Sequence, residues 1–163
     1  MVHVVRNLSI RDVPRILEIQ SAAYRPDLLE TAEVFASKIE SAPEWCLGVD
    51  GVEGKLVAYV IAFPMSSTAS VGLHETGTRT TSGDTPILYV HDMAVEPVAH
   101  GTGVGSAVLG ALENGARNNG QNVIELVAIE SAVTFWETKG FEVVDADVYE
   151  GYGPGARKMR RPV

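Results

Sequence analysis

The hydrophobic positions change their spacing along the chain, and one stretch combines two spacings around a glycine-rich turn. Residues 87–95 (ILYVHDMAV) form an apolar run that is too short for a typical helix and is stopped by Glu96-Pro97, which predicts a buried strand. Residues 104–112 place apolar side chains at i, i+3, i+4, i+7 and i+8, which predicts an amphipathic helix. Arg117 fits the last turn of that helix, and Gly120 fits the position just after its end.

The segments on either side of this stretch alternate between extended and helical patterns. Before it we expect a strand over residues 2–5, a helix from 13 to about 24, a second helix from about 32 to 42, and strands over 45–49 and 55–63. After it we expect a strand over 123–129, a helix over 132–139, and strands over 141–148 and 156–159. No internal repeat or linker interrupts the pattern, which therefore predicts one α/β domain over residues 1–163.

Several polar residues and prolines mark the expected ends of these elements. Ser9 with Asp12 has the form of a capping box, and Thr31 and Ser131 are the N-cap candidates of two later helices. Pro64 is expected to end its strand, and Gly140 to follow the end of the last helix.

Residues 65–86 are polar and rich in Ser, Thr and Gly, with little periodicity. A loop of this length in a compact domain usually has a function or moves. His74 and Glu75 within it are candidate ligand contacts, although a solvated loop is the favoured interpretation.

The glycine-rich turn between the central strand and helix predicts an anion site. Glycines at 101, 103 and 105 allow positive φ angles, and the start of a helix directs N–H groups and a positive dipole end at one point. A Walker phosphate loop is disfavoured because no lysine follows Gly105. A dinucleotide fingerprint is weakened because Ser106 replaces its third glycine, although Glu125 lies at a suitable distance for the ribose. The third alternative is a loop that binds the pyrophosphate of an acyl-CoA.

The stretch VHDMAVEPVAHGTGVGSAVL resembles the acetyl-CoA-binding motif of the GNAT superfamily of N-acetyltransferases. The family pattern of Arg or Gln, two residues, Gly, one residue, and Gly or Ala maps onto His100, Gly103 and Gly105, so His100 departs from it. A second segment, AVTFWETKGF at 132–141, resembles the family's later helix that ends in a Gly-Phe step. The resemblance extends loosely over nearly the whole chain.

This resemblance implies a mixed, mostly antiparallel sheet flanked by helices, with acetyl-CoA as the co-substrate. It implies a transfer of the acetyl group to a primary amine of a small molecule, amino acid or peptide, by direct attack in a ternary complex, and a possible homodimer. The backbone amides of Met93 and Val95 are expected to bind the pantetheine and the thioester carbonyl. The predicted cofactor-binding residues are Met93, Ala94, Val95, His100, Gly101, Thr102, Gly103, Val104, Gly105 and Ser106.

Direct transfer needs a general base, since only the neutral amine is nucleophilic. We expect His91 on the central strand to be that base, because histidines on this strand act as bases in the arylalkylamine branch of the resembled superfamily, and His91 matches one of those positions. Tyr89, two residues earlier, shares its face and is expected to orient it or to carry a proton. The alternative is a structural core histidine paired with Asp92 or with the backbone.

Other family features are replaced. A tyrosine that often serves as the general acid corresponds to Trp136, whose indole cannot protonate a thiolate, and the usual upstream Asn corresponds to Ile129. Tyr149 and Tyr152 are replacement candidates for the acid. These losses support an alternative hypothesis, a CoA-binding module without transferase activity. A nucleotide-binding domain remains a third hypothesis, based on the glycines alone.

The two early helices are expected to line the acceptor side, as the resemblance implies. Tyr24, Glu30 and Phe35 are candidate substrate contacts, with packing or solvent exposure as the favoured interpretation. The basic residues near the end of the sequence favour a solvated tail over contact with the CoA 3′-phosphate or a partner; these are Arg157, Lys158, Arg160 and Arg161.

The composition restricts the remaining function classes. Hydrophobic residues make up 45% and charged residues 21% of the 163, as in an ordinary soluble protein. No apolar run approaches the roughly 20 residues of a membrane span, and the first residues (MVHVVRN) lack a signal-peptide core. A single cysteine, Cys46, excludes an internal disulfide and a cysteine-based metal cluster, which fits a cytoplasmic setting without a metal. The net charge of -8 argues against nucleic acid as a partner.

Overall fold

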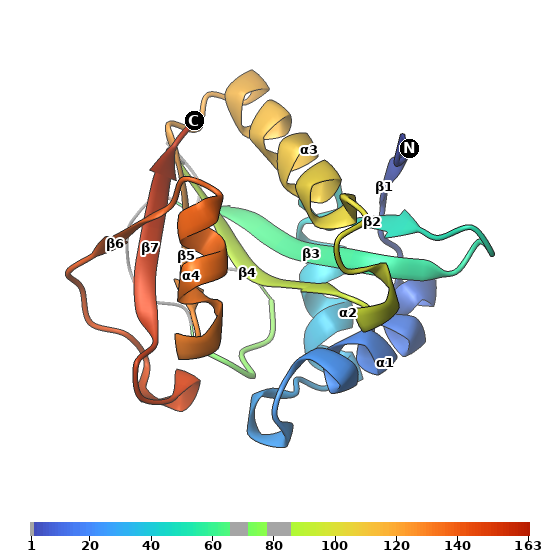
Figure 1. The fold of residues 1–163 in the computed structure, drawn as a ribbon, viewed down its shortest axis with the longest axis horizontal. Helices are drawn as coiled ribbons and strands as arrows, with labels where there is room; N and C mark the ends of the chain where they lie inside the picture. Colours follow the sequence, from blue (N-terminus) through green and yellow to red (C-terminus); the bar gives the residue numbers. More distant parts are fainter. Residues whose placement is uncertain (1, 66–71, 78–85) are drawn as a thin grey trace.

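The computed structural model describes residues 2–65, 72–77 and 86–163. In these residues seven strands form one sheet in the order β1-β2-β3-β4-β5-β7-β6 (Figure 1). Neighbouring strands run antiparallel except β4 and β5, which are parallel, so the expected α/β fold with a mixed, mostly antiparallel sheet is confirmed. The strands are β1 (Val5–Asn7), β2 (Leu47–Asp50), β3 (Leu56–Met65), β4 (Ile87–Val95), β5 (Val123–Ala128), β6 (Glu142–Val144) and β7 (Arg157–Pro162).

Four α-helices flank the described sheet, two on each face: α1 (Val13–Ala23), α2 (Ala32–Ser41), α3 (Val104–Asn118) and α4 (Val133–Thr138). Helices α1 and α2 pack with one set of sheet residues, such as Tyr59 and Ile61 of β3. Helices α3 and α4 pack with the alternate set, such as Val60 of β3. This two-sided burial explains why β3 and the first half of β4 are apolar at nearly every position.

Two of the three predicted N-caps are confirmed. Ser9 and Asp12 form the capping box, in a short 3-10 turn that leads into α1. The Thr31 hydroxyl accepts from the Val34 N–H at 3.3 Å. The prediction for Ser131 is wrong, because it lies inside a 3-10 turn and the N-cap of α4 is Ala132, without a side-chain hydrogen bond.

The pairing of β4 with its two neighbours determines where a cavity can form. Against β3 the register pairs Ile61 with Asp92 and Ala62 with Val90, so His91 is the extra residue of a β-bulge. Against β5 the pairing covers only Ile87 to Val90. Beyond Val90, the residues of β4 do not pair with β5. The two strands therefore separate from the bulge onward.

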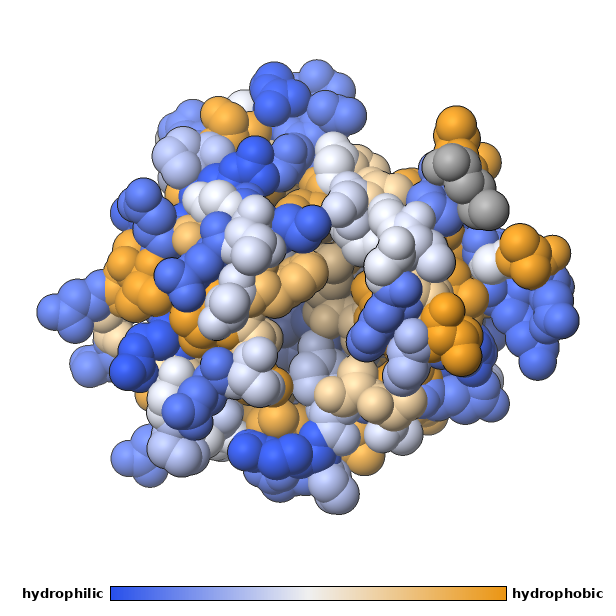
Figure 2. Space-filling model, in the orientation of Figure 1, coloured by the Kyte–Doolittle hydropathy of each residue, from blue (hydrophilic) through white to orange (hydrophobic). Residues whose placement is uncertain are grey.

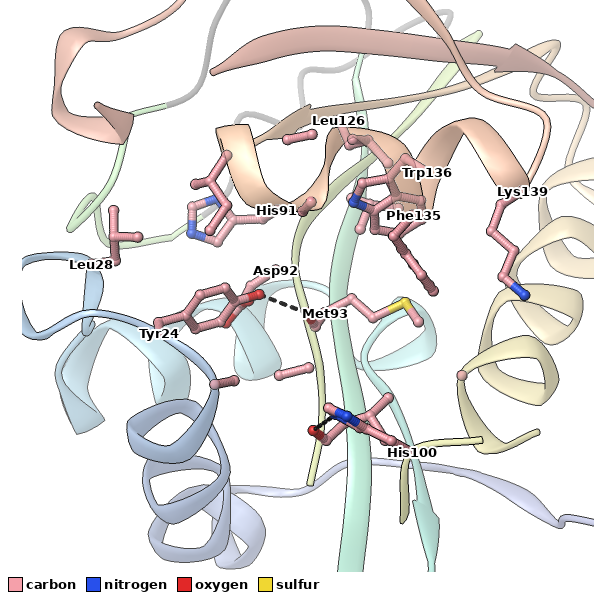
Figure 3. Close-up of a pocket in the computed structure, with 18 of the residues that line it drawn as sticks. Tyr24, Leu28, His91, Asp92, Met93, His100, Leu126, Phe135, Trp136 and Lys139 are labelled. Atoms are coloured by element: carbon pink, nitrogen blue, oxygen red, sulfur yellow. Dashed lines mark hydrogen bonds between the residues drawn. The ribbon is translucent and has the colours of Figure 1, made fainter. Parts of the chain in front are cut away.

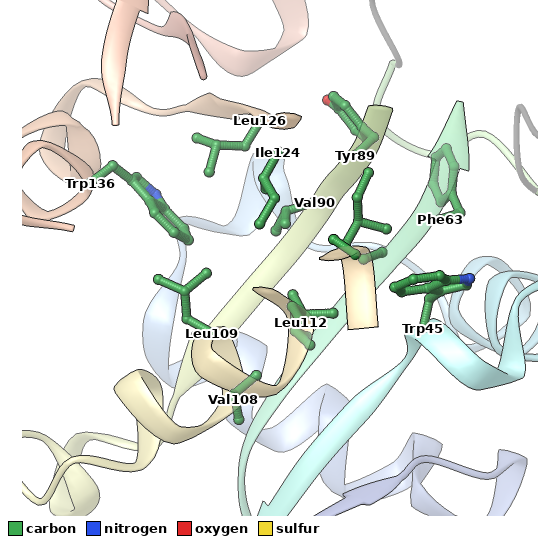
Figure 4. Close-up of a cluster of buried hydrophobic side chains, with 14 of the residues drawn as sticks. Trp45, Phe63, Tyr89, Val90, Val108, Leu109, Leu112, Ile124, Leu126 and Trp136 are labelled. Carbon is green, nitrogen blue, oxygen red and sulfur yellow. The ribbon is translucent and has the colours of Figure 1, made fainter. Parts of the chain in front are cut away.

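Helix α3 covers the strands next to this separation. Figure 4 shows Val108, Leu109 and Leu112 of α3 directed at β4 and β5, beside Ile124, with Trp136 of α4 at the edge of the cluster. Leu112 and Val108 are 0% exposed. The apolar stripe read from the sequence is therefore the face that holds α3 on the sheet.

Three predicted strand limits are wrong. Val2 and Val4 are 92% and 77% exposed, and the first strand starts only at Val5. Pro64 does not end β3, which continues to Met65. The strand expected over 141–148 is limited to 142–144, since only these residues pair with β7.

The expectation of a basic solvated tail is also wrong, because these residues form β7, which lies between β5 and β6. Its cations are partners of buried or half-buried acids: Lys158 Nζ lies 3.6 Å from Glu125 Oε2, Arg160 also pairs with Glu125, and Arg161 pairs with Glu113. Glu125 is 0% exposed. It therefore serves the sheet and not a nucleotide ribose.

Truncating the buried α3 face should destabilise the fold. We expect Leu112→Ala to lower the free energy of unfolding by about 2–5 kcal/mol, because it leaves a cavity against the sheet. Val52→Ala, at a position that is 94% exposed, is the control and should change it by less than about 0.5 kcal/mol. Urea unfolding followed by circular dichroism measures both, and equal small effects would contradict the described packing.

Candidate active site

A cavity of about 790 Å³ opens where β4 and β5 separate. Figure 2 shows the surface hollowed near the middle of this face, and Figure 3 shows Tyr24, which follows α1, together with side chains of β4 and α4 around the hollow. Every predicted cofactor-binding residue except Thr102 lines the cavity. Of the two predicted catalytic residues, His91 lines it and Tyr89 does not. The structure thus brings most of the predicted residues together in one place.

The free edge of β4 offers backbone donors to this cavity. Alternate residues of a strand face the same neighbour, and the Glu96 N–H donates to a β3 carbonyl at 2.8 Å, so Met93 and Val95 face away from β3. The Tyr24 hydroxyl lies 2.7 Å from the Met93 carbonyl oxygen, and His100 Nε2 lies 3.0 Å from that of Val95 (Figure 3). Both carbonyls are therefore covered, while the N–H groups of Met93 and Val95 face the gap.

The glycine-rich turn has the geometry of an anion site. Gly101 and Gly103 have φ angles of 76° and 89°, in the left-handed region that favours glycine. Gly103 is the N-cap of α3 and supplies no capping side chain. The first N–H groups of α3 have no intrahelical acceptor and point out of its positive end, beside Val104, Gly105 and Ser106 in the cavity wall.

Lys139, just after α4, is a site residue that the sequence interpretation missed. Its Nζ donates to the Ser106 hydroxyl at 2.9 Å and lies 5.6 Å from the centre of the Phe135 ring. The Lys139 ammonium and the positive end of the α3 dipole repel each other, so their proximity is unfavourable when nothing else is bound. A phosphate at this place would be attracted by the ammonium and by the helix end. Lys139 lies 33 residues from Ser106, so no local signal in the sequence connects the two.

His91 forms a buried pair with Glu30. The distance from His91 Nε2 to Glu30 Oε1 is 2.8 Å, and the two side chains are 0% and 2% exposed. Burial by itself raises the pKa of Glu30, but the hydrogen bond and charge of His91, with the His74 N–H, outweigh burial and lower it. Glu30 is therefore the carboxylate acceptor and Nε2 the donor. In the described residues, Nδ1 of His91 has no hydrogen-bond partner.

Because of the bulge, the side chains of His91 and Asp92 lie on the same side of the sheet, the side that α1 and α2 cover. His91 contacts Glu30 there, and Asp92 contacts Tyr24. Tyr59 Oη lies 2.6 Å from Asp92 Oδ2, and Tyr24 Oη lies 2.9 Å from Oδ1. Burial raises the pKa of Asp92 to about 6, and the two hydroxyls and His91 oppose this only in part.

Tyr24 has one hydroxyl proton for two acceptors, Asp92 Oδ1 and the Met93 carbonyl. When Asp92 is protonated at Oδ1, it can donate to Tyr24, and Tyr24 then donates to Met93. When Asp92 is ionised, it competes for the Tyr24 proton. The protonation state of Asp92 therefore influences whether the Tyr24 hydroxyl donates to the Met93 carbonyl at the free edge of β4.

The remaining predicted candidates separate into two groups. Tyr152 lines the cavity, and burial raises its pKa, as does its neighbour Tyr89, so it is a weaker acid than free tyrosine. Tyr149 is 48% exposed and lies outside the cavity. Trp136 forms part of the cavity wall, with ring centres 5.1 Å from those of Phe135 and Phe141. Ile129 lines the same cavity.

The segment between α1 and α2 contributes more to the site than was expected of it. Phe35 packs in the core as favoured, against Tyr59, but Tyr24 and Glu30 both line the cavity. His91 is paired neither with Asp92 nor with the backbone, but with Glu30. Of the long polar loop, residues 66–71 and 78–85 lie outside the described residues. Leu73 of the described part lines the cavity, and the His74 side chain is exposed.

A family model described as "Acetyltransferase (GNAT) domain" matches residues 57–160, well over half of the chain. The chain belongs to the GNAT acetyltransferase family. No curated protein sequence matches it significantly. In the described residues of this family member, no helix is long and apolar enough to span a membrane, and no group of three or more His, Cys, Asp or Glu side chains could hold a metal ion.

Solved structures confirm the GNAT fold at low sequence identity. Ard1 from Thermoplasma volcanium has a TM-score of 0.75 and 17% identity, covering 100% of this chain and 99% of that one. Naa50 from Arabidopsis thaliana, in complex with the bisubstrate analogue CoA-Ac-MVNAL, has a TM-score of 0.72 and 16% identity, covering 99% of both chains. The GNAT-like decarboxylase GphF, in complex with isobutyryl-CoA, has a TM-score of 0.75 and 15% identity, covering 98% of this chain and 99% of that one. The fold therefore accompanies acyl-CoA chemistry of more than one kind.

The raised pKa of Asp92 makes a pH-dependent contribution to stability. Its folded value of about 6 exceeds its ordinary value of 3.8, so the native state holds a proton that the unfolded chain has released. This contribution is present below pH ~4 and is lost as the pH rises through ~6, which amounts to about 3 kcal/mol. Asp92→Asn resembles the protonated acid, since its amide can accept from Tyr59 and donate to Tyr24.

We therefore expect the unfolding free energy of the wild type, relative to Asp92→Asn, to fall by about 3 kcal/mol between pH 4 and 7. Urea titrations of both proteins across this range measure the difference. A difference that stays constant with pH would show that Asp92 does not hold its proton in the native state.

Proposed function

We propose that the protein transfers an acetyl group from acetyl-CoA to a primary amine by direct attack in a ternary complex, with His91 as the general base. The observation that carries this proposal is the buried His91–Glu30 pair in the wall of the cavity that the glycine-rich turn also lines. A base and an anion site in one cavity are what a transfer between an amine and a CoA thioester requires.

Acetyl-CoA is expected to extend from the start of α3 along the free edge of β4. Its pyrophosphate is bound by the first N–H groups of α3, with Lys139 beside them. Its pantetheine arm extends along the free edge of β4. The thioester carbonyl accepts from an N–H of Met93 or Val95, where charge on its oxygen is stabilised as the amine attacks.

The amine arrives as an ammonium ion and must lose a proton before it attacks. Nδ1 of His91 is buried in this structure, so the acceptor end must open slightly for it to take this proton. The Nε2–H bond to the Glu30 carboxylate stabilises the resulting imidazolium. The amine nitrogen then bonds to the thioester carbon, and the carbon–sulfur bond breaks. The thiolate needs little help to leave, because an ordinary thiol has a pKa of about 8.5. Trp136 in place of a tyrosine is compatible with this scheme.

Removing the base should slow turnover strongly while acetyl-CoA still binds. We expect His91→Ala to lower kcat about 10²- to 10⁴-fold with an accepted amine. Glu30→Gln, which keeps an acceptor for Nε2 without its charge, should cause a smaller loss. Thiol release measures the rate, and the upward shift in Tm caused by acetyl-CoA measures binding. Near wild-type turnover in His91→Ala would show that His91 is not the base.

Lys139 should contribute to CoA affinity through the phosphates. We expect Lys139→Ala to raise the Kd for acetyl-CoA about 5- to 10-fold, as loss of one charge-assisted hydrogen bond does. The same variant should bind S-acetylpantetheine, which lacks the phosphates, as well as the wild type does. Lys55→Ala is the matched control, because Lys55 is exposed and lies outside the cavity. Calorimetry measures each Kd, and equal losses for both ligands would contradict a phosphate contact.

A CoA-binding module without transferase activity is the second candidate. It is favoured by Trp136 in place of the usual acid and by His100, whose ring bonds the Val95 carbonyl. Such a module would show the Tm shift with acetyl-CoA but release no thiol with any amine. A transferase shows both.

A further inference from the structure

We propose that the acceptor is an amine with no carboxylate next to its amino group, so that simple amines and carboxyl-masked amino acids react and free α-amino acids do not. The proposal rests on the proposed transferase function and names the substrate class of the same site. It derives from the charges that surround the proposed base.

Two buried carboxylates lie beside His91 at the acceptor end of the cavity. Glu30 is held there by His91 and by the His74 N–H, at 2.8 and 2.9 Å. Asp92 is held by the hydroxyls of Tyr59 and Tyr24. Both acids line the cavity, and above pH ~7 both are ionised, since the pKa of Glu30 is lowered and that of Asp92 is about 6.

The lysines near these acids do not line the acceptor end of the cavity in the part of the chain that the structure describes. Of the described residues, Lys139 is the one lysine or arginine that lines the cavity. It belongs to the phosphate end, and Figure 3 shows it across the cavity from His91 and Leu28. Lys38 of α2 is buried, its charge helps to lower the pKa of Glu30, and its Nζ bonds the Glu75 carbonyl, but it does not line the cavity. Among the described residues, the lining of the acceptor end therefore carries two carboxylates and no lysine or arginine.

This charge distribution separates amines by what is attached next to the nitrogen. An ammonium ion is attracted into the acceptor end, where His91 can take its proton. An α-carboxylate lies two bonds from that nitrogen, so the geometry that brings the nitrogen to His91 also brings the carboxylate close to Glu30 or Asp92. Like charges held this close oppose binding strongly.

The other walls fit a neutral, apolar body. Leu28, Leu73 and Ala22 line the acceptor end without charge. The two tyrosines that line the cavity have buried hydroxyls with partners of their own: Tyr24 bonds Asp92 and Met93, and Tyr152 neighbours Tyr89. An aromatic or aliphatic amine matches these walls better than a second charged group does.

The test compares phenethylamine, phenylalanine and phenylalanine methyl ester at saturating acetyl-CoA and pH 8. Phenylalanine differs from phenethylamine only by the carboxylate, and the ester masks that charge. We expect kcat/KM for phenethylamine and for the ester to exceed that for phenylalanine by at least about 100-fold. Thiol release gives the rates, and mass spectrometry identifies the acetylated product.

Asp92→Asn removes one of the two charges without a change in size. We expect it to raise the ratio of kcat/KM for phenylalanine to that for phenethylamine about 5- to 10-fold. The ratio remains informative even where the absolute rates of the variant fall. Tyr149→Phe, at an exposed position outside the cavity, is the control and should leave the ratio unchanged.

The outcomes separate this proposal from the function on which it rests. Phenylalanine accepted within about threefold of phenethylamine, or a ratio unchanged in Asp92→Asn, overturns the substrate class and leaves the transferase intact. No thiol release from phenethylamine or the ester, by protein that acetylates a peptide amine, overturns the substrate class alone. No thiol release from any primary amine, by protein that binds acetyl-CoA, contradicts both proposals.

Discussion

The separation of β4 from β5 after their first four paired residues is the constraint on which the site depends. Where a β-strand leaves its neighbour, its backbone N–H and C=O groups lose their partners in the sheet. Inside a protein these groups need other hydrogen-bond partners. Here the cavity occupies the opened space, two side chains cover the outward carbonyls of β4, and the remaining N–H groups face the cavity. The bulge at His91 marks the same point and turns two consecutive polar side chains to one side. One irregularity therefore provides both the space and the chemistry.

The polar cluster beside the bulge is a costly element of the fold. Glu30 bonds His91, and Asp92 bonds Tyr24 and Tyr59, in a mostly buried region. Buried polar groups of this kind stabilise a protein little in total, and an apolar core of the same volume would be at least as stable. Their presence at the end of a cavity is better explained by proton transfer and by selection among ligands than by stability.

The parts of the fold that follow local rules could be predicted from the sequence. The limits of β4, the glycine-rich turn and the apolar stripe of α3 depend on residues within a few positions of each other, and all were found. Contacts between distant segments could not be predicted. Glu30 lies 61 residues from His91, and the charges of β7 look solvated until their partner Glu125 is known. A bulge also leaves no mark in a strand that is apolar on both faces, as the first half of β4 is, so the sequence indicates Asp92 only as a neighbour of His91.

The position of β7 has a consequence for the order in which the chain becomes structured during synthesis. In the described sheet, β6 pairs with β7 alone, and β7 follows β6 in the sequence. Residues 142–144 therefore leave the ribosome before the strand that holds them, and Glu125 is made before Lys158 and Arg160. A nascent chain that ends before Arg157 lacks two strands instead of one, and its β5 carries a carboxylate without its cations. This side of the sheet can become native only after β7 has emerged.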